Sequence, residues 1–416
     1  MQTTIKSHIR EQIYEAFKNA IIQHPQYLDD EQLSREGQFD VLTEIFNANV
    51  RNREIGEITR HFAPVFQNGH PVHLSVLGKT GTGKTITLLY LLHEISMLCS
   101  EQHIPFRQYH LDLCCPAPCF RALNNLGCLM GASKYYKRGI SLDDLMRSIE
   151  TKLKSAKGYI VIFIDEADNI RTDPDSFYKF LIKRLPQKIE AKLILLFSSN
   201  RLSWTENLDP RIKSCLKMRE LLFDPYNAND LQHILNIRVE KALRPKMVDE
   251  GVVPKIAAYA SRTHGDARKA VDLLTRSAQL AEKKGEKITL DCVDEAYEEI
   301  EKDKYLAMIR TCPKQLQAAL YAALTGKAQG RALHTGDAYL VYERFCHEAG
   351  MPPLTQRAFT DLLSELDMYG FIRARTVSRG RYGRTKEIYV SLTPQILASM
   401  KRTILNSFDL DEVNYE

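Results

Sequence analysis

The sequence predicts an α/β fold, in which a mainly parallel sheet is followed by a helical segment and a mixed C-terminal domain. Between residues 71 and 200, apolar strand-like runs alternate with amphipathic helical segments, the pattern of a sheet covered by helices. The runs at 159–165 and 192–199 are apolar throughout, as expected of strands that are buried on both faces. From residue 227 the pattern is helical, and beyond 304 helices precede two strands.

Each element has its own local signal. Ser141, Asn227 and Thr355 are residue types that favour the N-cap position of a helix. Strands are expected at 72–78, 107–113, 159–165, 192–199, 371–377 and 386–392. Helices are expected at 84–98, after 141, at 228–243, 253–262, 266–283 and 290–303, and three times between 304 and 370, with one more at the C-terminus. The predicted domains are an N-terminal helical extension (1–48), an α/β base (49–225), a helical lid (226–303) and a C-terminal domain (304–416).

Composition narrows the class of protein. The chain has 416 residues, enough for roughly two to four domains. A net charge of +5 is too small to indicate nucleic-acid binding, so that argument depends on local clusters of charge. Lys6, Arg10 and Glu11 interrupt any apolar leader, and no apolar run approaches the ~20 residues that span a bilayer. We therefore expect a cytoplasmic protein that is not a membrane protein.

The nine cysteines are too sparse for a disulfide framework, which favours free thiols in a reducing compartment. Four of them form a cluster at positions 114, 115, 119 and 128. Their spacing lacks the two paired halves that are typical of zinc sites. Small buried side chains are the favoured interpretation of this cluster, with zinc as the alternative.

The segment GKTGTGKT at 78–85 fits the phosphate-loop pattern G-x-x-x-x-G-K-[ST]. It follows a predicted strand and begins a predicted helix, so backbone N–H groups and the helix N-terminus would face phosphate oxygens. Lys84 would reach the β- and γ-phosphates, and Thr85 would ligate Mg²⁺. An accidental glycine-rich turn is the alternative. The predicted nucleotide contacts in this segment are Gly78, Lys79, Thr80, Gly81, Thr82, Gly83, Lys84, Thr85 and Ile86.

Polar residues follow two of the buried strands. Asp165 and Glu166 end the strand at 159–165, where open α/β sheets bind ligands. Asp165 is the expected Mg²⁺ ligand, and Glu166 is the expected base that orients the attacking water. Asn200 ends the next buried strand and would hold that water, while Arg268 at a helix start would reach the γ-phosphate. The alternatives are an acidic strand end, an asparagine in a turn and a surface arginine.

Together these motifs resemble those of AAA+ ATPases. More narrowly, the chain resembles the archaeal replication-initiator family, which is related to origin recognition complex subunits and to the eukaryotic helicase loader. The resemblance is carried, in the family's order over about residues 45–400, by NREIGEITRHFAPVF, GKTGTGKT, FIDEADNI, LDPRIKS, FDPYNANDLQHIL and HGDARKAVDLL. Individual AAA+ motifs are not specific to one family, whereas this combination with a C-terminal winged helix is.

The resemblance assigns roles to further residues. Lys84 and Thr85 match Walker A, Asp165 and Glu166 match Walker B, and Asn200 and Arg268 match the two sensors. The same likeness places Val50, Arg51 and Tyr226 at the nucleotide pocket, and Arg121 in a helical insertion that touches DNA.

One position departs from the family. Many relatives carry a serine–arginine pair whose arginine reaches a neighbouring subunit's nucleotide, but here Cys215 follows Ser214. Arg211 is the candidate substitute, and the alternative is that it is structural or solvated.

The C-terminal domain also reads as a winged helix from its own residues. Thr355 caps a helix whose exposed start can reach base edges or phosphates. The hairpin that follows is basic, with no acidic residue between 371 and 386. An ordinary solvated hairpin is the alternative to DNA contact. The predicted DNA-binding residues are Arg121, Thr355, Gln356, Arg357, Thr360, Arg379, Arg381, Arg384 and Lys386.

The sequence therefore predicts an ATP-dependent initiator that binds double-stranded origin DNA and recruits or loads an MCM-type replicative helicase. ATP or ADP with Mg²⁺ is the expected cofactor, slow hydrolysis acts as a switch, and paralogous initiator subunits are candidate partners. Two alternatives remain open. One is an AAA+ DNA-binding ATPase of a mobile element or defence system, and the other is a DNA-binding regulator whose ATP site only stabilises the fold.

Overall fold

The computed structural model describes residues 20–29, 32, 39–67, 73–132, 140–206, 208–216, 218–262, 265–325, 333–378 and 384–410. The chain forms two compact units, residues 1–293 and 294–416. None of the helices within these described ranges has the length and apolar content that crossing a bilayer requires.

A five-stranded parallel sheet forms the centre of the first unit, in the order β2-β4-β6-β1-β7. Its strands are β1 (His73–Leu77), β2 (Phe106–Asp112), β4 (Tyr159–Asp165), β6 (Lys192–Ser199) and β7 (Met218–Leu222). β4 and β6 lie inside the sheet and are buried along almost their whole length, so the predicted parallel α/β sheet is confirmed. Its edge strand β7 was not expected, because only Leu221 in it is buried.

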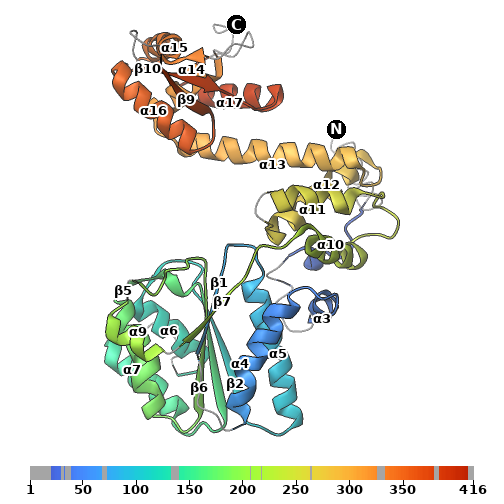
Figure 1. Cartoon of the computed structure of the whole chain (residues 1–416), viewed down its shortest axis with the longest axis vertical. Helices are drawn as coiled ribbons and strands as arrows, with labels where there is room; N and C mark the ends of the chain where they lie inside the picture. The colour runs from blue at the N-terminus through green and yellow to red at the C-terminus, as the bar shows by residue number, and fades with distance from the viewer. Residues whose placement is uncertain are drawn as a thin grey trace, which may run out of the picture. The chain divides into compact units, whose positions relative to one another are not determined.

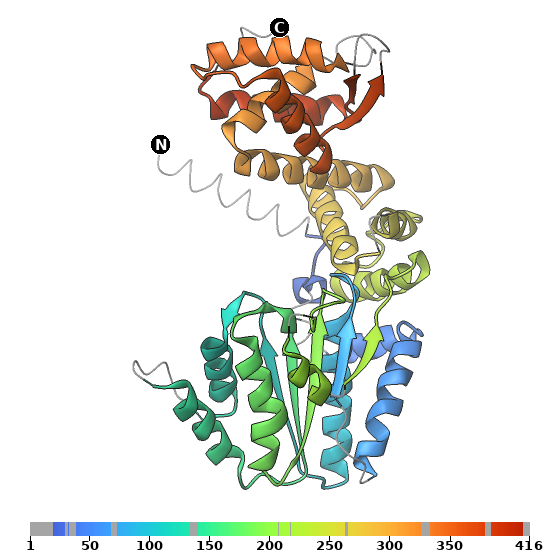
Figure 2. The ribbon, with the colours of Figure 1, turned by 60° about the vertical axis from the view of Figure 1, so that its left-hand side comes forward.

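Two layers of helices cover the sheet (Figures 1 and 2). Because strand side chains alternate between faces, Val161 and Leu196 pack toward α4 (Asn52–Phe66) and α5 (Lys84–Glu101). Ile162 and Leu195 pack toward the opposite layer. That layer consists of α6 (Cys119–Leu129), α7 (Leu142–Leu153), α8 (Pro174–Lys179) and α9 (Pro210–Leu216).

Short elements complete this layer. β3 (Ala117–Pro118) pairs in parallel with β5 (Ile170–Thr172). Two 3-10 turns, η2 (Ala167–Asn169) and η4 (Leu185–Gln187), and a π turn, η3 (Phe180–Arg184), connect the longer elements.

The helical lid is built from α10 (Ala228–Ala242), α11 (Val252–Arg262) and α12 (Ala267–Lys284). Asn227 caps α10 in a reciprocal capping box with Asp230, which explains why the helix begins there. The next helix, α13 (Leu290–Thr311), is longer than the expected 290–303 and runs across the division between the two units. The four-part domain division remains a prediction.

The N-terminal extension is described only from residue 20. Its first described part pairs with the lid, since Ile22 forms a β-bridge with Leu243 and the Glu282 carboxylate accepts the backbone N–H groups of Ile21 and Ile22 at 2.6 and 2.8 Å. A 3-10 turn, η1 (Pro25–Leu28), and α3 (Phe39–Asn47) follow. α3 packs against α10 of the lid, and its Phe39 ring stacks on His93 of α5.

The second unit has its own aromatic core, which includes Tyr342, Phe345, Phe359 and Phe371. Its helices are α14 (Lys314–Thr325), α15 (Thr335–Glu348), α16 (Gln356–Met368) and α17 (Pro394–Ser407). An antiparallel sheet in the order β8-β10-β9 joins β8 (Leu333–His334), β10 (Arg384–Tyr389) and β9 (Arg373–Ser378). Helices followed by a hairpin and a last helix confirm the predicted winged-helix architecture, although both hairpin strands are displaced by about two residues from their expected ranges.

Candidate functional site

The phosphate loop joins β1 to α5 at the carboxyl edge of the sheet. Gly81 (φ 75°) and Gly83 (φ 79°) adopt the left-handed conformation that favours glycine. A Cβ on Gly83 would lie 2.0 Å from the Tyr226 hydroxyl oxygen, so this position also has no room for a side chain. Gly83 is the N-cap of α5 and provides no capping side chain, which leaves the helix N-terminus suited to a phosphate.

Lys84 lies buried beneath this loop. Its Nζ donates hydrogen bonds to the Gly78 and Lys79 carbonyl oxygens at 2.9 and 2.8 Å, and to Asn200 Oδ1 at 2.9 Å. Burial lowers the pKa of Lys84 to about 8, against the opposing effect of the Asp165 charge. All three direct acceptors are neutral, so the site can still accept an anion, and the residues present fit a phosphate group.

Asp165 ends β4 next to the phosphate loop. Its Oδ1 accepts the Ser198 hydroxyl and the Glu166 backbone N–H, the latter at 3.1 Å, and its Oδ2 lies 3.7 Å from His110 Nε2. Burial raises the pKa of Asp165, but interactions with His110, Ser198 and the Thr85 hydroxyl outweigh it and hold the pKa below its ordinary value. The carboxylate is therefore charged and lies beside Thr85, a suitable pair for a divalent cation.

Glu166 follows in a left-handed backbone conformation (φ 54°), which is uncommon for a residue with a side chain. Asn169 Nδ2 donates to its Oε2 at 2.7 Å and also to the Leu113 carbonyl. Burial and the neighbouring Asp165 charge raise the pKa of Glu166. A carboxylate with a raised pKa and a fixed orientation is suited to work as a general base.

Arg51 joins the base, the phosphate loop and the start of the lid. Its guanidinium lies 4.0 Å from the centre of the Tyr226 ring and pairs with Glu54 at 2.9 Å. It also donates to the carbonyl oxygens of Thr82 and Asp224 at 2.8 and 2.6 Å. Arg51 is thus buried among protein partners, and its contacts hold the base, the phosphate loop and the start of the lid together.

The lid touches the phosphate loop through the start of α12. The Ala267 N–H donates to the Gly81 carbonyl at 3.1 Å, and Asp266 caps the helix by accepting the N–H groups of Arg268 and Lys269. The Arg268 charge lowers the pKa of both Lys84 and Glu166, although it is not the main influence on either. Its electrostatic effect therefore reaches the centre of the site.

The remaining predicted nucleotide contacts are distributed around this centre. Val50 is buried, Ile86 is half-buried, and Lys79 and Thr80 are exposed. Arg211 is exposed on α9, which packs against α8 and η3 rather than against α5. Its backbone N–H donates to Asp209 Oδ1 at 2.7 Å.

Sequence reasoning missed several supporting residues of this site: His110, Asn169, Ser198 and Glu54. Ser198 and Asn169 carry a weak signal, because they are polar residues at or just after the ends of buried strands. The partner of His110 depends on packing between distant segments, and no local pattern indicates it. Glu54 pairs with Arg51 three residues earlier, a spacing at which side chains meet across one helical turn, so a local signal for this pair was present.

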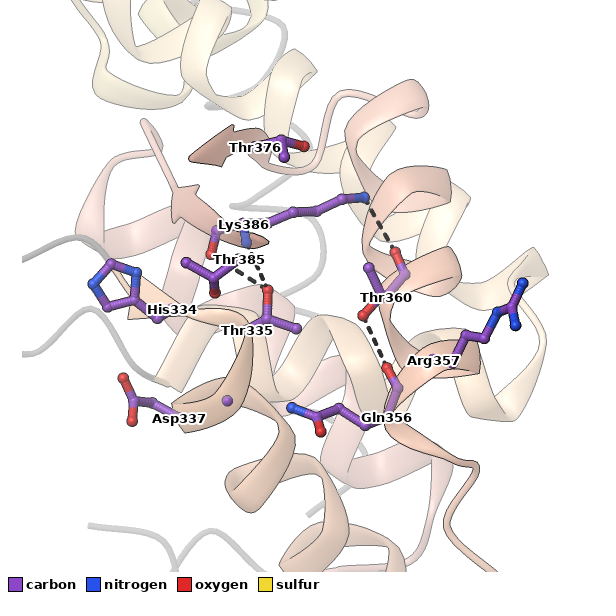
Figure 3. Close-up of a pocket in the computed structure, with 10 residues that line it drawn as sticks. His334, Thr335, Asp337, Gln356, Arg357, Thr360, Thr376, Thr385 and Lys386 are labelled. Atoms are coloured by element: carbon purple, nitrogen blue, oxygen red, sulfur yellow. Dashed lines mark hydrogen bonds between the residues drawn. The ribbon is translucent and has the colours of Figure 1, made fainter. Parts of the chain in front are cut away.

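The second candidate site is a groove in the winged-helix unit (Figure 3). It is lined by His334, Thr335, Gly336, Asp337, Gln356, Arg357, Thr360, Thr376, Thr385 and Lys386. Thr355 caps α16 by accepting the Ala358 N–H, as predicted. Gln356 reaches toward the Asp337 side of the groove and Arg357 points away from it. We refer to α16 as the recognition helix and to β9 with β10 as the hairpin.

Strand register determines which residues of the hairpin lie together. Arg375 pairs with Glu387, and Arg373 pairs with Tyr389. Glu387, the acidic residue that directly follows the basic run of the hairpin, thus lies opposite Arg375 of that run. Arg379 and Arg381 lie outside the described residues, and Arg384 begins β10.

Arg121 is exposed on α6, and the other side of that helix contributes Leu123 and Leu126 to the core. Cys114, Cys115, Cys119 and Cys128 form no disulfides, and burial raises the pKa of Cys119 to about 12. The other three are exposed, so the expected burial of this cluster is wrong for them. Across the described part of the chain, no three His, Cys, Asp or Glu side chains group as metal ligands would.

Comparisons with known proteins identify the family. Residues 232–298 match the model of the Cdc6 AAA+ ATPase-type lid domain, and residues 307–399 match the CDC6 C-terminal winged helix domain. The chain is 35% identical over 364 residues to an ORC1-type DNA replication protein of Pyrococcus furiosus, and the aligned residues cover 85% of this chain and 85% of that protein. The chain belongs to the ORC1-type DNA replication protein family.

Other relatives agree with this assignment. An ORC1-type DNA replication protein 1 of Methanosarcina mazei is 34% identical over 385 residues, which cover 90% of this chain and 88% of that protein. The Aeropyrum pernix ORC1 protein, solved in complex with DNA, matches with a TM-score of 0.61 and 30% identity, over 86% of this chain and 92% of that one. The predicted resemblance to archaeal replication initiators is therefore confirmed.

Proposed function

We propose that this protein is a replication initiator that binds and hydrolyses ATP and binds double-stranded origin DNA. The observation that supports it most is the buried Lys84 ammonium, which has only neutral hydrogen-bond acceptors and lies near the Asp165–Glu166 pair. This site occurs in one chain with a winged helix, and the related Aeropyrum pernix ORC1 protein is known in complex with DNA.

The chain's own residues divide the work at the nucleotide site. ATP supplies the phosphoryl bond that is hydrolysed, and Mg²⁺ offsets the phosphate charge. Lys84 and the N-terminus of α5 bind the phosphates, while Thr85 and Asp165 hold the cation. Glu166 accepts the proton of the attacking water, whose position Asn200 fixes.

The lid and the base together complete the site. Arg268 would add positive charge from α12, where its charge already acts on Lys84 and Glu166. Tyr226, Val50 and the Arg51 network form the wall on which the nucleoside packs. Because Ala267 bonds directly to the phosphate loop, the state of the nucleotide would be transmitted to the lid.

On the DNA side, the start of the recognition helix carries Thr355, Gln356 and Arg357 on an exposed surface. These residue types serve base-edge and phosphate contacts. Arg379, Arg381 and Arg384 would extend the contact from the hairpin, and Arg121 would add one from the base. Phosphate contacts of this kind make binding fall steeply with salt.

We further propose that the protein recruits or loads an MCM-type helicase and acts with paralogous subunits. We also propose that it hydrolyses ATP slowly, with Mg²⁺, in the cytoplasm. Cys215 lies where many relatives carry the arginine that reaches a neighbouring subunit's nucleotide. Its presence there supports slow hydrolysis, because Arg211 is then the one arginine on α9 that could act on a neighbouring subunit.

Footprinting on the DNA that flanks the gene tests the DNA-binding role. Protection of a repeated element at a replication origin is the expected result. Equal affinity for that DNA and for random duplex of the same length would contradict it, and would favour a role in a mobile element or in defence.

Two variants test the ATPase. Glu166→Gln should keep ATP binding and lower turnover by about 10²–10⁴-fold, whereas Lys84→Ala should lose binding. A Lys84→Ala protein with unchanged DNA binding and unchanged biological activity would instead favour a nucleotide that only stabilises the fold.

A further inference from the structure

Lys386 in β10 joins three elements of the winged-helix unit. Its Nζ donates a hydrogen bond to the Thr360 carbonyl oxygen at 3.2 Å and another to the Ser364 hydroxyl, both on the recognition helix. Its backbone N–H donates to Thr335 Oγ1, at the start of α15, at 3.0 Å. Figure 3 shows the Lys386 side chain spanning the groove from the hairpin to Thr360.

We propose that Lys386 is a positioning residue that fixes the hairpin against the recognition helix, rather than a phosphate contact. This inference rests on the proposed DNA-binding function and revises the expectation that Lys386 contacts DNA. An ammonium group has three donors, and two of them are already directed at oxygens of the recognition helix. While these two bonds stand, only the third donor is left for a phosphate, and the position of the ammonium is set by the recognition helix.

The network continues along the helix toward the DNA-facing end. The Thr360 hydroxyl donates to the Gln356 carbonyl at 2.8 Å, and the Ser364 hydroxyl donates to the Thr360 carbonyl at 3.0 Å. Lys386 therefore bonds to the helix one and two turns after Gln356, and Thr360 links these bonds to the turn that presents Gln356 and Arg357. Thr360 is half-buried and already bonded, so it is a second member of this network.

A separate bond secures the other strand of the hairpin. The Ala374 N–H in β9 donates to Asp367 Oδ1, near the end of the recognition helix, at 3.1 Å. With Lys386 on β10 and Ala374 on β9, both strands are attached to one helix. The distance between the DNA contacts of the hairpin and those of the helix is therefore fixed in the DNA-free protein. Less conformational entropy is then lost when DNA binds.

The test compares three variants of the full chain: Lys386→Met, Ser364→Ala and Arg357→Gln. Lys386→Met removes the ammonium and keeps an unbranched apolar stem. Ser364→Ala removes one partner of Lys386 without changing any charge. Arg357→Gln is the matched charge-removal control, because Arg357 is exposed on the same helix. DNA affinity is measured by fluorescence anisotropy over a series of salt concentrations, with one duplex throughout.

We expect Lys386→Met to weaken binding on the order of tenfold at every salt concentration, with an unchanged salt slope. Arg357→Gln should lower the slope by about one. Ser364→Ala should weaken binding in the same way as Lys386→Met but less, and the double variant should be no weaker than Lys386→Met alone, because the two residues share one interaction.

Two results would overturn the proposal. One is a Lys386→Met slope that falls by as much as that of Arg357→Gln. The other is full additivity of Lys386→Met and Ser364→Ala.

Hydrogen exchange of the DNA-free chain gives a measurement that does not depend on DNA. The backbone amides of position 386 and of Ala374 should exchange faster in Lys386→Met than in wild type, after correction for the intrinsic rate of each residue type, and unchanged protection would also overturn the proposal. If the wild-type chain itself does not bind DNA, the proposed function fails, and exchange alone decides whether Lys386 fixes the hairpin.

Discussion

At the residue scale, the buried ammonium of Lys84 links nucleotide binding to pH. Its pKa is lowered to about 8 from 10.5, so it begins to lose its proton in the nucleotide-free chain at mildly alkaline pH. Between the folded-state pKa of about 8 and the ordinary value of 10.5, the unfolded chain binds more protons than the folded one, so the contribution of Lys84 to stability rises with pH. A bound phosphate favours the protonated form of Lys84 and therefore opposes the loss of its proton.

The first prediction follows from this competition. Nucleotide binding should take up a proton above pH 8, and affinity should fall by up to about tenfold per pH unit there. Calorimetry at pH 7.5 and 9.0, in pairs of buffers with different ionisation heats, measures the uptake. Lys84→Arg is the control, because its guanidinium stays charged over this range. Binding heats that do not depend on the buffer at pH 9.0 would contradict the assignment.

Asn169 is a second residue with a direct chemical consequence, since its amide orients Glu166. Its N–H favours the charged carboxylate, so Asn169→Ala should raise the pKa of Glu166 further. The prediction is that the rise of kcat with pH moves to higher pH and that turnover falls roughly tenfold, while ATP affinity is kept. A lower kcat with an unmoved pH profile would mean that Asn169 supports only the fold.

At the element scale, the N-terminus of α12 is the part of the lid that touches the phosphate loop. Asp266 caps this helix, and its carboxylate also fills the space next to Gly81. The cap therefore fixes both the start of the helix and the position of Arg268, two residues on.

Asp266→Ala should destabilise the protein by about 1 kcal/mol, the usual cost of losing an N-cap. It should also lower ATP turnover by more than that loss of stability explains, because Arg268 is no longer held. Asp266→Asn keeps a capping oxygen and should stay within a few tenths of a kcal/mol of wild type. Denaturant unfolding with ATPase assays on both variants measures this, and equal turnover in the two would argue against the coupling.

Elements with strong local signals could be predicted from the sequence, and elements defined by their partners could not. β4 and β6 are continuous apolar runs, and the phosphate loop combines a fixed spacing with a strand before it and a helix after it. The edge strand β7 lacks such a run, because solvent covers most of its residues. The bonds of Ile21 and Ile22 to Glu282 join segments about 260 residues apart, which no window of sequence reveals.

The same distinction applies to the candidate sites. The places of Lys84, Asp165 and Glu166 in the fold could be predicted, because they follow from the motif and from the strand end. Lys386 was predicted only as one basic residue among several, since its partners Thr360 and Ser364 lie on a helix more than 20 positions earlier. Charge pattern alone does not separate a cation that binds a helix from one that binds a phosphate.

At the scale of the whole molecule, two sites in different units have to influence each other if ATP controls DNA binding. α13 begins in the unit that holds the nucleotide site and ends in the winged-helix unit, without a break in the helix. Thermodynamic linkage requires any such influence to be reciprocal. Replacing bound ADP with ATP changes the affinity for DNA by some factor. Binding of DNA must change the ratio of the ATP affinity to the ADP affinity by the same factor.

We expect this factor to be about 5–150, the usual range of coupling between two sites. Equilibrium titrations on Glu166→Gln, which we expect to bind ATP and turn it over very slowly, supply both halves of the comparison. If the continuous helix carries the coupling, Asp303→Gly with Lys304→Gly should reduce the factor toward one, because each exposed glycine costs an α-helix about 1 kcal/mol. The alanine pair at the same positions removes the same charges and preserves the helix, so it should keep the factor. Equal loss in both pairs would assign the effect to charge, and a factor of one in the parent would mean that nucleotide does not control DNA binding.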